Sequence, residues 1–173
     1  MNHVDLWVDC QQRRLIKSNG EFENEDPVFV RGDDLLLKIR FRDVDRSASP
    51  FVLANRSLPA GSLLRFCGKV AYDGAVLVLA DVDAWSGPDG EAQVYECEVS
   101  FASAALLSAI GSSASKEVHF DISVLDPDGS STTLLVLNAN VLNDVYRGDE
   151  TVPAEAPTYP TTAELAARLP ANI

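Results

Sequence analysis

Apolar and polar residues alternate along much of this chain up to residue 142, and this period of two limits the fold more than any other feature. From position 35 to 41 every odd residue is apolar, whereas positions 38, 40 and 42 are basic. Successive side chains of a β-strand point to opposite faces, so this segment predicts a strand with one buried face. The same pattern predicts further strands at residues 3–10, 51–55, 63–70, 75–85, 92–101, 117–125 and 132–142, with a short apolar run at 13–17.

Residues 103–110 break the alternation and predict a short helix. They are rich in alanine and leucine, and Ser103 and Gly111 are residue types that commonly begin and end helices. Several strands with a single short helix, and no regular exchange of strand and helix, indicate an all-β fold. We expect an antiparallel β-sandwich over residues 1–146.

Two segments carry more detailed predictions about the sheets. Residues 75–80 are apolar at both parities, which indicates a central strand that is covered on both faces. Residues 126–129 read Asp-Pro-Asp-Gly, which favours a tight turn. Strands 117–125 and 132–142 should therefore form a hairpin.

The composition changes after residue 146. Residues 147–173 contain several prolines and acidic residues, which is typical of an extended linker. Thr161 and Glu164 have the spacing of a capping box, and Leu165 and Leu169 lie four residues apart, on one face of a predicted helix. Such a short helix is not stable alone. We expect Leu165 and Leu169 to dock on the domain or on another copy of the chain.

The chain is strongly acidic, and its charge is unevenly distributed. Its formal net charge is −12 at pH 7. Residues 1–86 carry 11 cations and 13 anions, whereas residues 87–173 carry 3 cations and 13 anions. This balance argues against binding to nucleic acids or to anionic membranes, both of which attract basic proteins. The one basic strip, Lys38, Arg40 and Arg42, is either a solvated face or a surface that docks on an acidic partner.

No motif for catalysis, cofactor binding or metal binding stands out. The chain has two histidines and three widely spaced cysteines, Cys10, Cys67 and Cys97, without a Cys-x-x-Cys pair. We therefore expect free, buried thiols and no disulfide, zinc site, cofactor or enzymatic activity. Residues 1–5 contain no basic or apolar stretch, so we expect no signal peptide and synthesis in the cytoplasm.

Trp7 and Trp85 both have the parity opposite to the predicted core. Each is either an exposed platform for a sugar or a protein, or a residue covered by a loop or helix. The second interpretation is preferred, because the outer face of a sandwich strand can also be covered.

The order of several short motifs resembles the N-terminal attachment domain of phage upper-baseplate and tail-fibre proteins. The resemblance covers about residues 3–146. The motifs are Asp-Leu-Trp-Val-Asp at residues 5–9, an Arg-Gly-Asp turn at 31–33 that leads into the strand ending at Asp43, Val-Tyr-Glu-Cys at 94–97 before the helix, and Asn-Asp-Val at 143–145. In that family, a similar turn feeds the second main strand, and the last hairpin leads into a linker that carries fibre or receptor-binding modules.

This resemblance implies a structural attachment module without catalysis. Its partners would be other tail or baseplate proteins, and its final location would be the virion. The linker and helix 161–169 would form a homo-oligomer, with a trimer favoured, and Lys38, Arg40 and Arg42 would dock on an acidic neighbour. The alternative is a β-sandwich that binds a glycan or small ligand, which predicts an exposed Trp7 or Trp85 and a concave acidic pocket.

Overall fold

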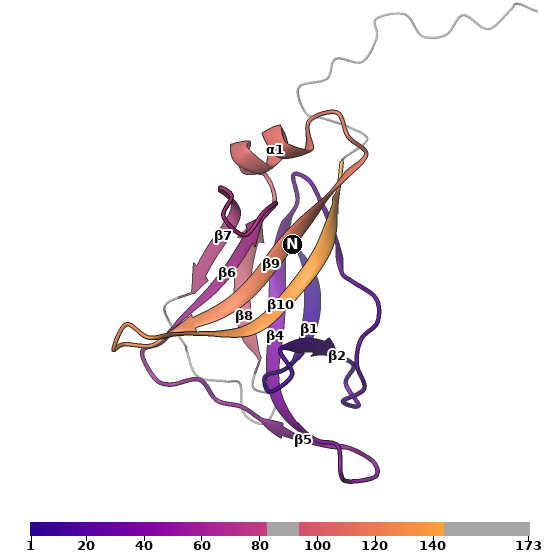
Figure 1. The fold of residues 1–173 in the computed structure, drawn as a ribbon, viewed down its shortest axis with the longest axis vertical. Coiled ribbons are helices and arrows are strands. Elements are labelled where there is room, and N and C mark those ends of the chain that lie inside the picture. The colour runs from indigo at the N-terminus through magenta and orange to yellow at the C-terminus, as the bar shows by residue number, and fades with distance from the viewer. Residues whose placement is uncertain (83–93, 144–173) are drawn as a thin grey trace, which may run out of the picture.

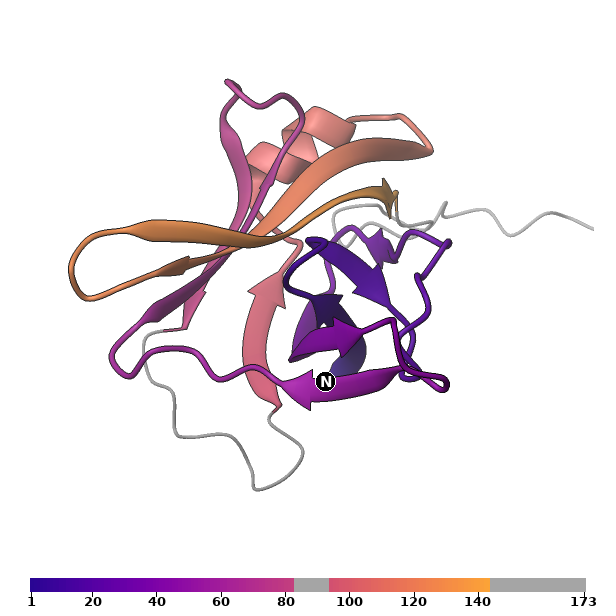
Figure 2. The same cartoon turned by 60° about the horizontal axis from the view of Figure 1, so that its bottom comes forward.

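The computed structural model describes residues 1–82 and 94–143, and these form a β-sandwich (Figures 1 and 2). The elements are β1 (Asn2–Asp9), β2 (Arg14–Ile16), β3 (Val28–Val30), β4 (Asp34–Asp45), β5 (Val52–Asn55), β6 (Leu63–Lys69), β7 (Val76–Val82), β8 (Tyr95–Ser100), α1 (Ala104–Ile110), β9 (Ser115–Leu125) and β10 (Ser131–Leu142). The predicted all-β sandwich is confirmed. Trp85 and the predicted linker and helix of residues 147–173, with Leu165 and Leu169, lie outside the described residues.

Within the described ranges, the strands form two five-stranded sheets. In the first sheet the order is β2-β1-β4-β5, and β8 pairs with the same strand β4; in the second it is β3-β10-β9-β6-β7. The pairs β1–β4 and β3–β10 are parallel, so the prediction of purely antiparallel pairing is wrong for them. The path of the chain explains why β1 and β4 are parallel. After β1, β2 runs back along it, and the chain then crosses to the other sheet as β3 before it returns as β4, which gives the long connection that a parallel pair needs.

Four buried phenylalanines form one cluster in the core: Phe29, Phe66 and Phe120 belong to the second sheet, and Phe101 meets them from the end of β8 in the first sheet. The ring of Phe29 stacks on that of Phe101 with their centroids 4.6 Å apart, and Phe66 stacks on Phe120 at 5.1 Å. Pairs of this kind contribute about 0.5–1.5 kcal/mol each beyond the area that they bury. Phe29 belongs to β3, a strand of three residues that the alternation alone does not predict as a separate element.

The short helix α1 begins and ends where the sequence predicts. The Ser103 hydroxyl accepts a hydrogen bond from the Leu106 backbone N–H at 3.1 Å and donates one to the Leu77 carbonyl in β7. Gly111 ends the helix with a positive φ of 55°. The buried side chains of Leu106 and Ile110 anchor α1 on the core. In the described part of the chain, no helix has the length and apolar character needed to cross a membrane.

The strand β7 is an end strand, and the prediction that residues 75–80 form a central strand is wrong. It pairs with β6 on one side and stands last in its sheet. A register shift in the pairing of β6 with β7 puts both Val76 and Leu79 on the outer face, whereas Leu77 and Val78 are buried, so apolar residues occur at both parities.

The predicted hairpin of β9 and β10 is confirmed. The Gly129 N–H donates to the Asp126 carbonyl at 2.9 Å, and the tip of the hairpin extends beyond the sandwich in both views (Figures 1 and 2). A bulge between Thr133 and Leu135 inserts one residue into β10. After this bulge, every second residue from Val136 to Leu142 points outward.

Candidate functional site

The basic strip of β4 lies on the outer face of the first sheet, where acidic neighbours neutralise much of its charge. The Nζ of Lys38 is 3.9 Å from a carboxylate oxygen of Glu96 in β8. The Nη1 of Arg40 donates to the Asp5 carboxylate of β1 at 2.5 Å. Lys38 and Arg40 therefore offer less free positive charge than their sequence pattern suggests.

Arg42 differs from the expected solvated residue because it is only 4% exposed. Its Nη1 donates to the Phe41 carbonyl at 2.9 Å, and its guanidinium carbon lies 5.0 Å from the centroid of the Trp7 ring. Burial, followed by the neighbouring charge of Arg40, lowers the pKa of Arg42 below its ordinary value. The expectation of a solvated face is thus wrong for this residue, while docking through the strip stays a prediction.

Trp7 is half-buried, so it is neither the fully exposed platform nor the fully covered residue that the sequence allowed. Its ring lies within 5.0 Å of the guanidinium carbons of both Arg40 and Arg42. These cation–π contacts hold the indole against the sheet. Beside it lies a groove of about 470 Å³, whose rim carries Glu23, Glu25 and Asp26.

The outer face of the second sheet carries a surface that sequence reasoning did not identify. Leu79 of β7 lies opposite Cys67 of β6, Cys67 lies opposite Asp121 of β9, and Asp121 lies opposite Val136 of β10. Residues directly opposite in paired strands point to the same face, so these four side chains form one row across the sheet.

A second row runs parallel to the first. It consists of Val76, Lys69, His119 and Asn138, again from four neighbouring strands. We call the apolar and aromatic part of both rows, with the turn residue above them, the outer platform; it consists of Cys67, Tyr72, Val76, Leu79, His119 and Val136.

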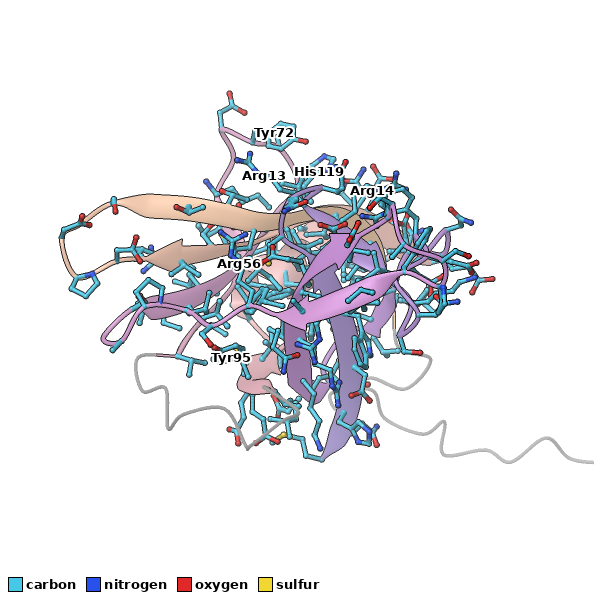
Figure 3. All side chains as sticks on the ribbon, turned by 90° about the horizontal axis from the view of Figure 1, so that it is seen from below. Arg13, Arg14, Arg56, Tyr72, Tyr95 and His119 are labelled. Carbon is cyan, nitrogen blue, oxygen red and sulfur yellow. The ribbon has the colours of Figure 1, made fainter. Side chains whose placement is uncertain are left out.

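Tyr72 covers the second row from the turn between β6 and β7. Its ring stacks on the His119 imidazole with a centroid distance of 5.1 Å and an interplanar angle of 14°. The Nδ1 of His119 is 2.5 Å from the Asn138 side-chain oxygen. Figure 3 shows Tyr72 and His119 on one side of the molecule, near Arg13 and Arg14. A pocket of about 150 Å³ lies beneath this pair, with Cys67 and Val136 in its wall.

The outer platform exposes large apolar side chains in a molecule of high net charge. The exposed fractions are 76% for Tyr72, 53% for Leu79, 46% for Val136 and 42% for Val76. Isolated exposed apolar residues are common, but several that gather on one sheet face indicate a binding surface.

An ion pair borders the outer platform next to Leu79 and Cys67. Arg65 binds both carboxylate oxygens of Asp81 across β6 and β7, at 2.8 and 2.9 Å. These hydrogen bonds lower the pKa of Asp81. The pair therefore contributes little net charge to the surface.

The remaining candidate groups support the fold. Cys10 and Cys97 are buried and reduced, and burial raises the pKa of each thiol to about 11. Cys67 is partly exposed on the outer platform, unlike the expectation of burial. Among the residues that the structure describes, no group of three or more His, Cys, Asp or Glu side chains is placed to hold a metal ion. The Arg-Gly-Asp segment at 31–33 is a turn, with Gly32 at φ 89°.

The comparisons with known proteins do not assign this chain to a family. No family model matches the chain, and no curated protein matches it. What the structure defines is a β-sandwich with an apolar platform on one outer face and a neutralised basic strip on the other.

Proposed function

We propose that this chain is a non-catalytic attachment module that docks on a neighbouring protein of a phage tail or baseplate. The observation that supports this proposal is the outer platform, where Tyr72, Leu79, Val136 and Val76 gather on one face. Asp121 and Lys69 lie between these apolar side chains in the two rows, and protein interfaces commonly combine apolar and polar groups in this way. The final location of the protein would be the virion.

The outer platform is a better docking surface than the basic strip. The side chains of Lys38 and Arg40 already have acidic partners, so docking would have to break these pairs or include them. Side chains of the outer platform can lose their hydration without breaking a salt bridge. Apolar burial contributes about 25 cal/mol per Å² removed from water.

The experiment uses the full chain and tail particles purified from the phage that encodes it. Leu79→Lys and Val136→Lys each place a charge on the outer platform without changing a buried residue. The matched control is Val52→Lys, because Val52 is 56% exposed but lies on β5 of the first sheet. We expect both platform variants to lose incorporation and the control to retain it.

Cys67 provides an independent readout of the same contact. It lines the platform pocket, whereas Cys10 and Cys97 are buried. A docked partner should slow alkylation of Cys67 relative to the free chain. Incorporation of both platform variants at the level of the unmodified chain, with unchanged alkylation of Cys67, would show that the outer platform does not dock.

The predicted oligomer has its own test. Leu165 and Leu169 remain the proposed contacts of a trimer. Sedimentation of the full chain should give a trimer, and Leu165→Asp with Leu169→Asp should give a monomer. A monomer in both forms would contradict the fibre-type assembly, while leaving the docking test unaffected.

Glycan binding is the second candidate function. Tyr72 favours it, because an exposed aromatic ring beside the polar groups of His119 and Asn138 can hold a sugar. Trp7 is less suited, since two guanidinium groups already contact its ring. A glycan array probed with the full chain and with Tyr72→Ala decides this: binding that disappears in the variant supports a glycan site, and absence of binding removes it.

A further inference from the structure

The groove beside Trp7 lies along the edge of β1 rather than over a face of the sheet. Residues Val4, Asp5, Leu6 and Trp7 all line it. Consecutive side chains of a strand point to opposite faces, so a cavity that touches four in succession must run along the strand's edge.

Among the described residues, no strand pairs with this edge of β1 over its first half. On the other side, β4 pairs with β1 from Asn2 to Asp9. On the groove side, β2 pairs only with Trp7, Val8 and Asp9, because β2 ends at Ile16. Residues 2–6 therefore leave one edge open in the described part of the chain.

The direction of the backbone groups follows from one hydrogen bond. The Cys10 N–H donates to the Arg42 carbonyl of β4 at 3.0 Å. Peptide groups alternate along a strand, so the even residues of β1 face β4 and the odd residues face the opposite side. The backbone N–H and C=O of His3 and Asp5 consequently face the open edge.

Much of the lining that comes from outside β1 is acidic. Glu23, Glu25 and Asp26 line the groove, and Lys17 is the cation beside them. The Glu23 carboxylate accepts the Glu25 N–H at 3.3 Å, which holds this segment in a turn. Apolar side chains, among them Val4 and Leu15, also line the groove.

We propose that an extended, basic segment of a partner protein binds in this groove as an added strand on β1. Its backbone pairs with Asp5 and His3, in the manner of β-strand addition. Alternate side chains of an added strand separate to the two faces, so lysine or arginine side chains reach Glu23, Glu25 and Asp26 while small apolar ones contact Val4. The acidic segment also borders a second cavity that Tyr72 and Val136 of the outer platform line, but the open edge of β1 belongs to the groove. The inference does not depend on the proposed attachment function.

The charge of the groove selects against the chain's own C-terminal segment. Residues 148–173 contain four acidic residues and a single arginine. Like charges facing each other across a strand pair are destabilising. A basic segment from another protein is therefore the occupant that the groove fits.

The test uses the full chain and synthetic peptides. The probe is a short peptide that alternates lysine and valine; a second peptide replaces lysine with glutamate, and a third carries N-methyl groups on the backbone. NMR spectra of the isotope-labelled chain report where each peptide binds. We expect the lysine peptide to shift the amide signals of His3 and Asp5, and the other two peptides to bind at least tenfold more weakly.

Two variants separate the charge from the fold. Glu23→Lys combined with Glu25→Lys should weaken the lysine peptide about fivefold or more, since exposed charge pairs contribute up to about 1 kcal/mol each. The matched control is Glu98→Lys, an exposed acidic residue on β8, which should bind as the unmodified chain does. Thermal unfolding of each variant verifies that the fold is intact.

Three results would overturn the inference. The first is equal binding of the glutamate peptide, and the second is equal binding of the N-methylated peptide. The third is a set of shifted signals centred on Tyr72 and His119, which would assign the peptide to the outer platform. Failure of tail incorporation in the platform variants would leave this test unchanged.

Discussion

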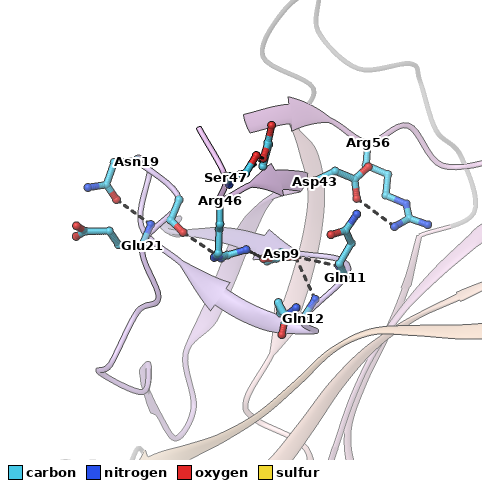
Figure 4. Close-up of polar contacts among 11 residues, drawn as sticks. Asp9, Gln11, Gln12, Asn19, Glu21, Asp43, Arg46, Ser47 and Arg56 are labelled. Carbon is cyan, nitrogen blue, oxygen red and sulfur yellow. Dashed lines mark hydrogen bonds and ion pairs between the residues drawn. The ribbon is translucent and has the colours of Figure 1, made fainter. Parts of the chain in front are cut away.

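The buried ion pair between Asp9 and Arg46 allows a sharp prediction about stability. The Asp9 side chain is fully buried; one oxygen accepts the Gln11 and Gln12 N–H groups at 3.0 and 3.1 Å, and the other is 2.6 Å from Arg46 (Figure 4). Arg46 is 28% exposed and also donates to the Gly20 carbonyl at 3.1 Å. The two partners therefore lose different amounts of solvation when the pair is broken.

This difference predicts unequal costs for the two single substitutions. Asp9→Asn leaves Arg46 with access to water and to its other acceptor, so we expect a loss of about 1.5–3 kcal/mol in the free energy of unfolding. Arg46→Met leaves a fully buried carboxylate without its cation, so we expect about 3–5 kcal/mol. The double variant should lose less than the two single losses combined, because neither charge remains.

Urea unfolding at pH 7, monitored by circular dichroism, measures all three costs. The matched control is Arg56→Met, whose pair with Asp43 is exposed and 3.3 Å long, so its loss should stay below about 1 kcal/mol. Two results would refute this reasoning. Either Arg46→Met lowers the free energy of unfolding no more than Asp9→Asn does, or the loss in the double variant equals the sum of the two single losses. In either case the burial of Asp9 would not determine how much this ion pair contributes to stability.

Three further predictions concern other parts of the fold. Gly68→Ala places a Cβ 2.4 Å from the buried Phe120 ring, so the free energy of unfolding should fall by about 1–3 kcal/mol. Phe120→Leu also costs stability, so the double variant should lose less than the two single losses combined in thermal unfolding, and simple addition of the two losses would rule out the clash. Ser103→Ala should cost about 1 kcal/mol and speed hydrogen exchange in the first turn of α1, and unchanged exchange would deny the cap its role. Burial raises the pKa of Cys10 and Cys97 from an ordinary value of 9.0 to about 11, so the folded state keeps protons that the unfolded chain releases. The stability that these thiols contribute is therefore complete below pH 9 and falls as the pH rises to 11. Over this range the urea midpoint should fall less in the variant with Cys10→Ala and Cys97→Ala than in the unmodified chain.

Local sequence patterns predict which face of a strand is buried better than they predict which strands pair with each other. The alternation at residues 35–41 places Leu37 and Phe41 in the core, where both are fully buried. It contains no information on which strand pairs with β4, so the parallel pairing with β1 escaped prediction. That pairing depends on where β3 goes, and β3 is held by one buried residue, Phe29, in a strand of three.

The candidate sites were harder to predict because they depend on position within a sheet. The apolar residues 75–80 look like a buried central strand, yet they lie at the end of the second sheet and expose Leu79. A run that is apolar at both parities was thus the available signal for the outer platform. Arg42 shows the reverse case, because a basic residue on an outer face is buried by its contact with Trp7.

The pairing of β3 with β10 has a consequence during synthesis of the protein. Arg31 and Asn143, which lie at the ends of these strands and share a hydrogen bond, are 112 residues apart in the chain. At about 5–20 residues per second, a ribosome needs roughly 6–22 s to make the partner of β3 after β3 itself. During that time the apolar strand has an unpaired edge, next to other growing chains on the same messenger RNA. Three acidic residues, Glu23, Glu25 and Asp26, directly precede this strand, and charges that flank an apolar strand disfavour its pairing with other copies.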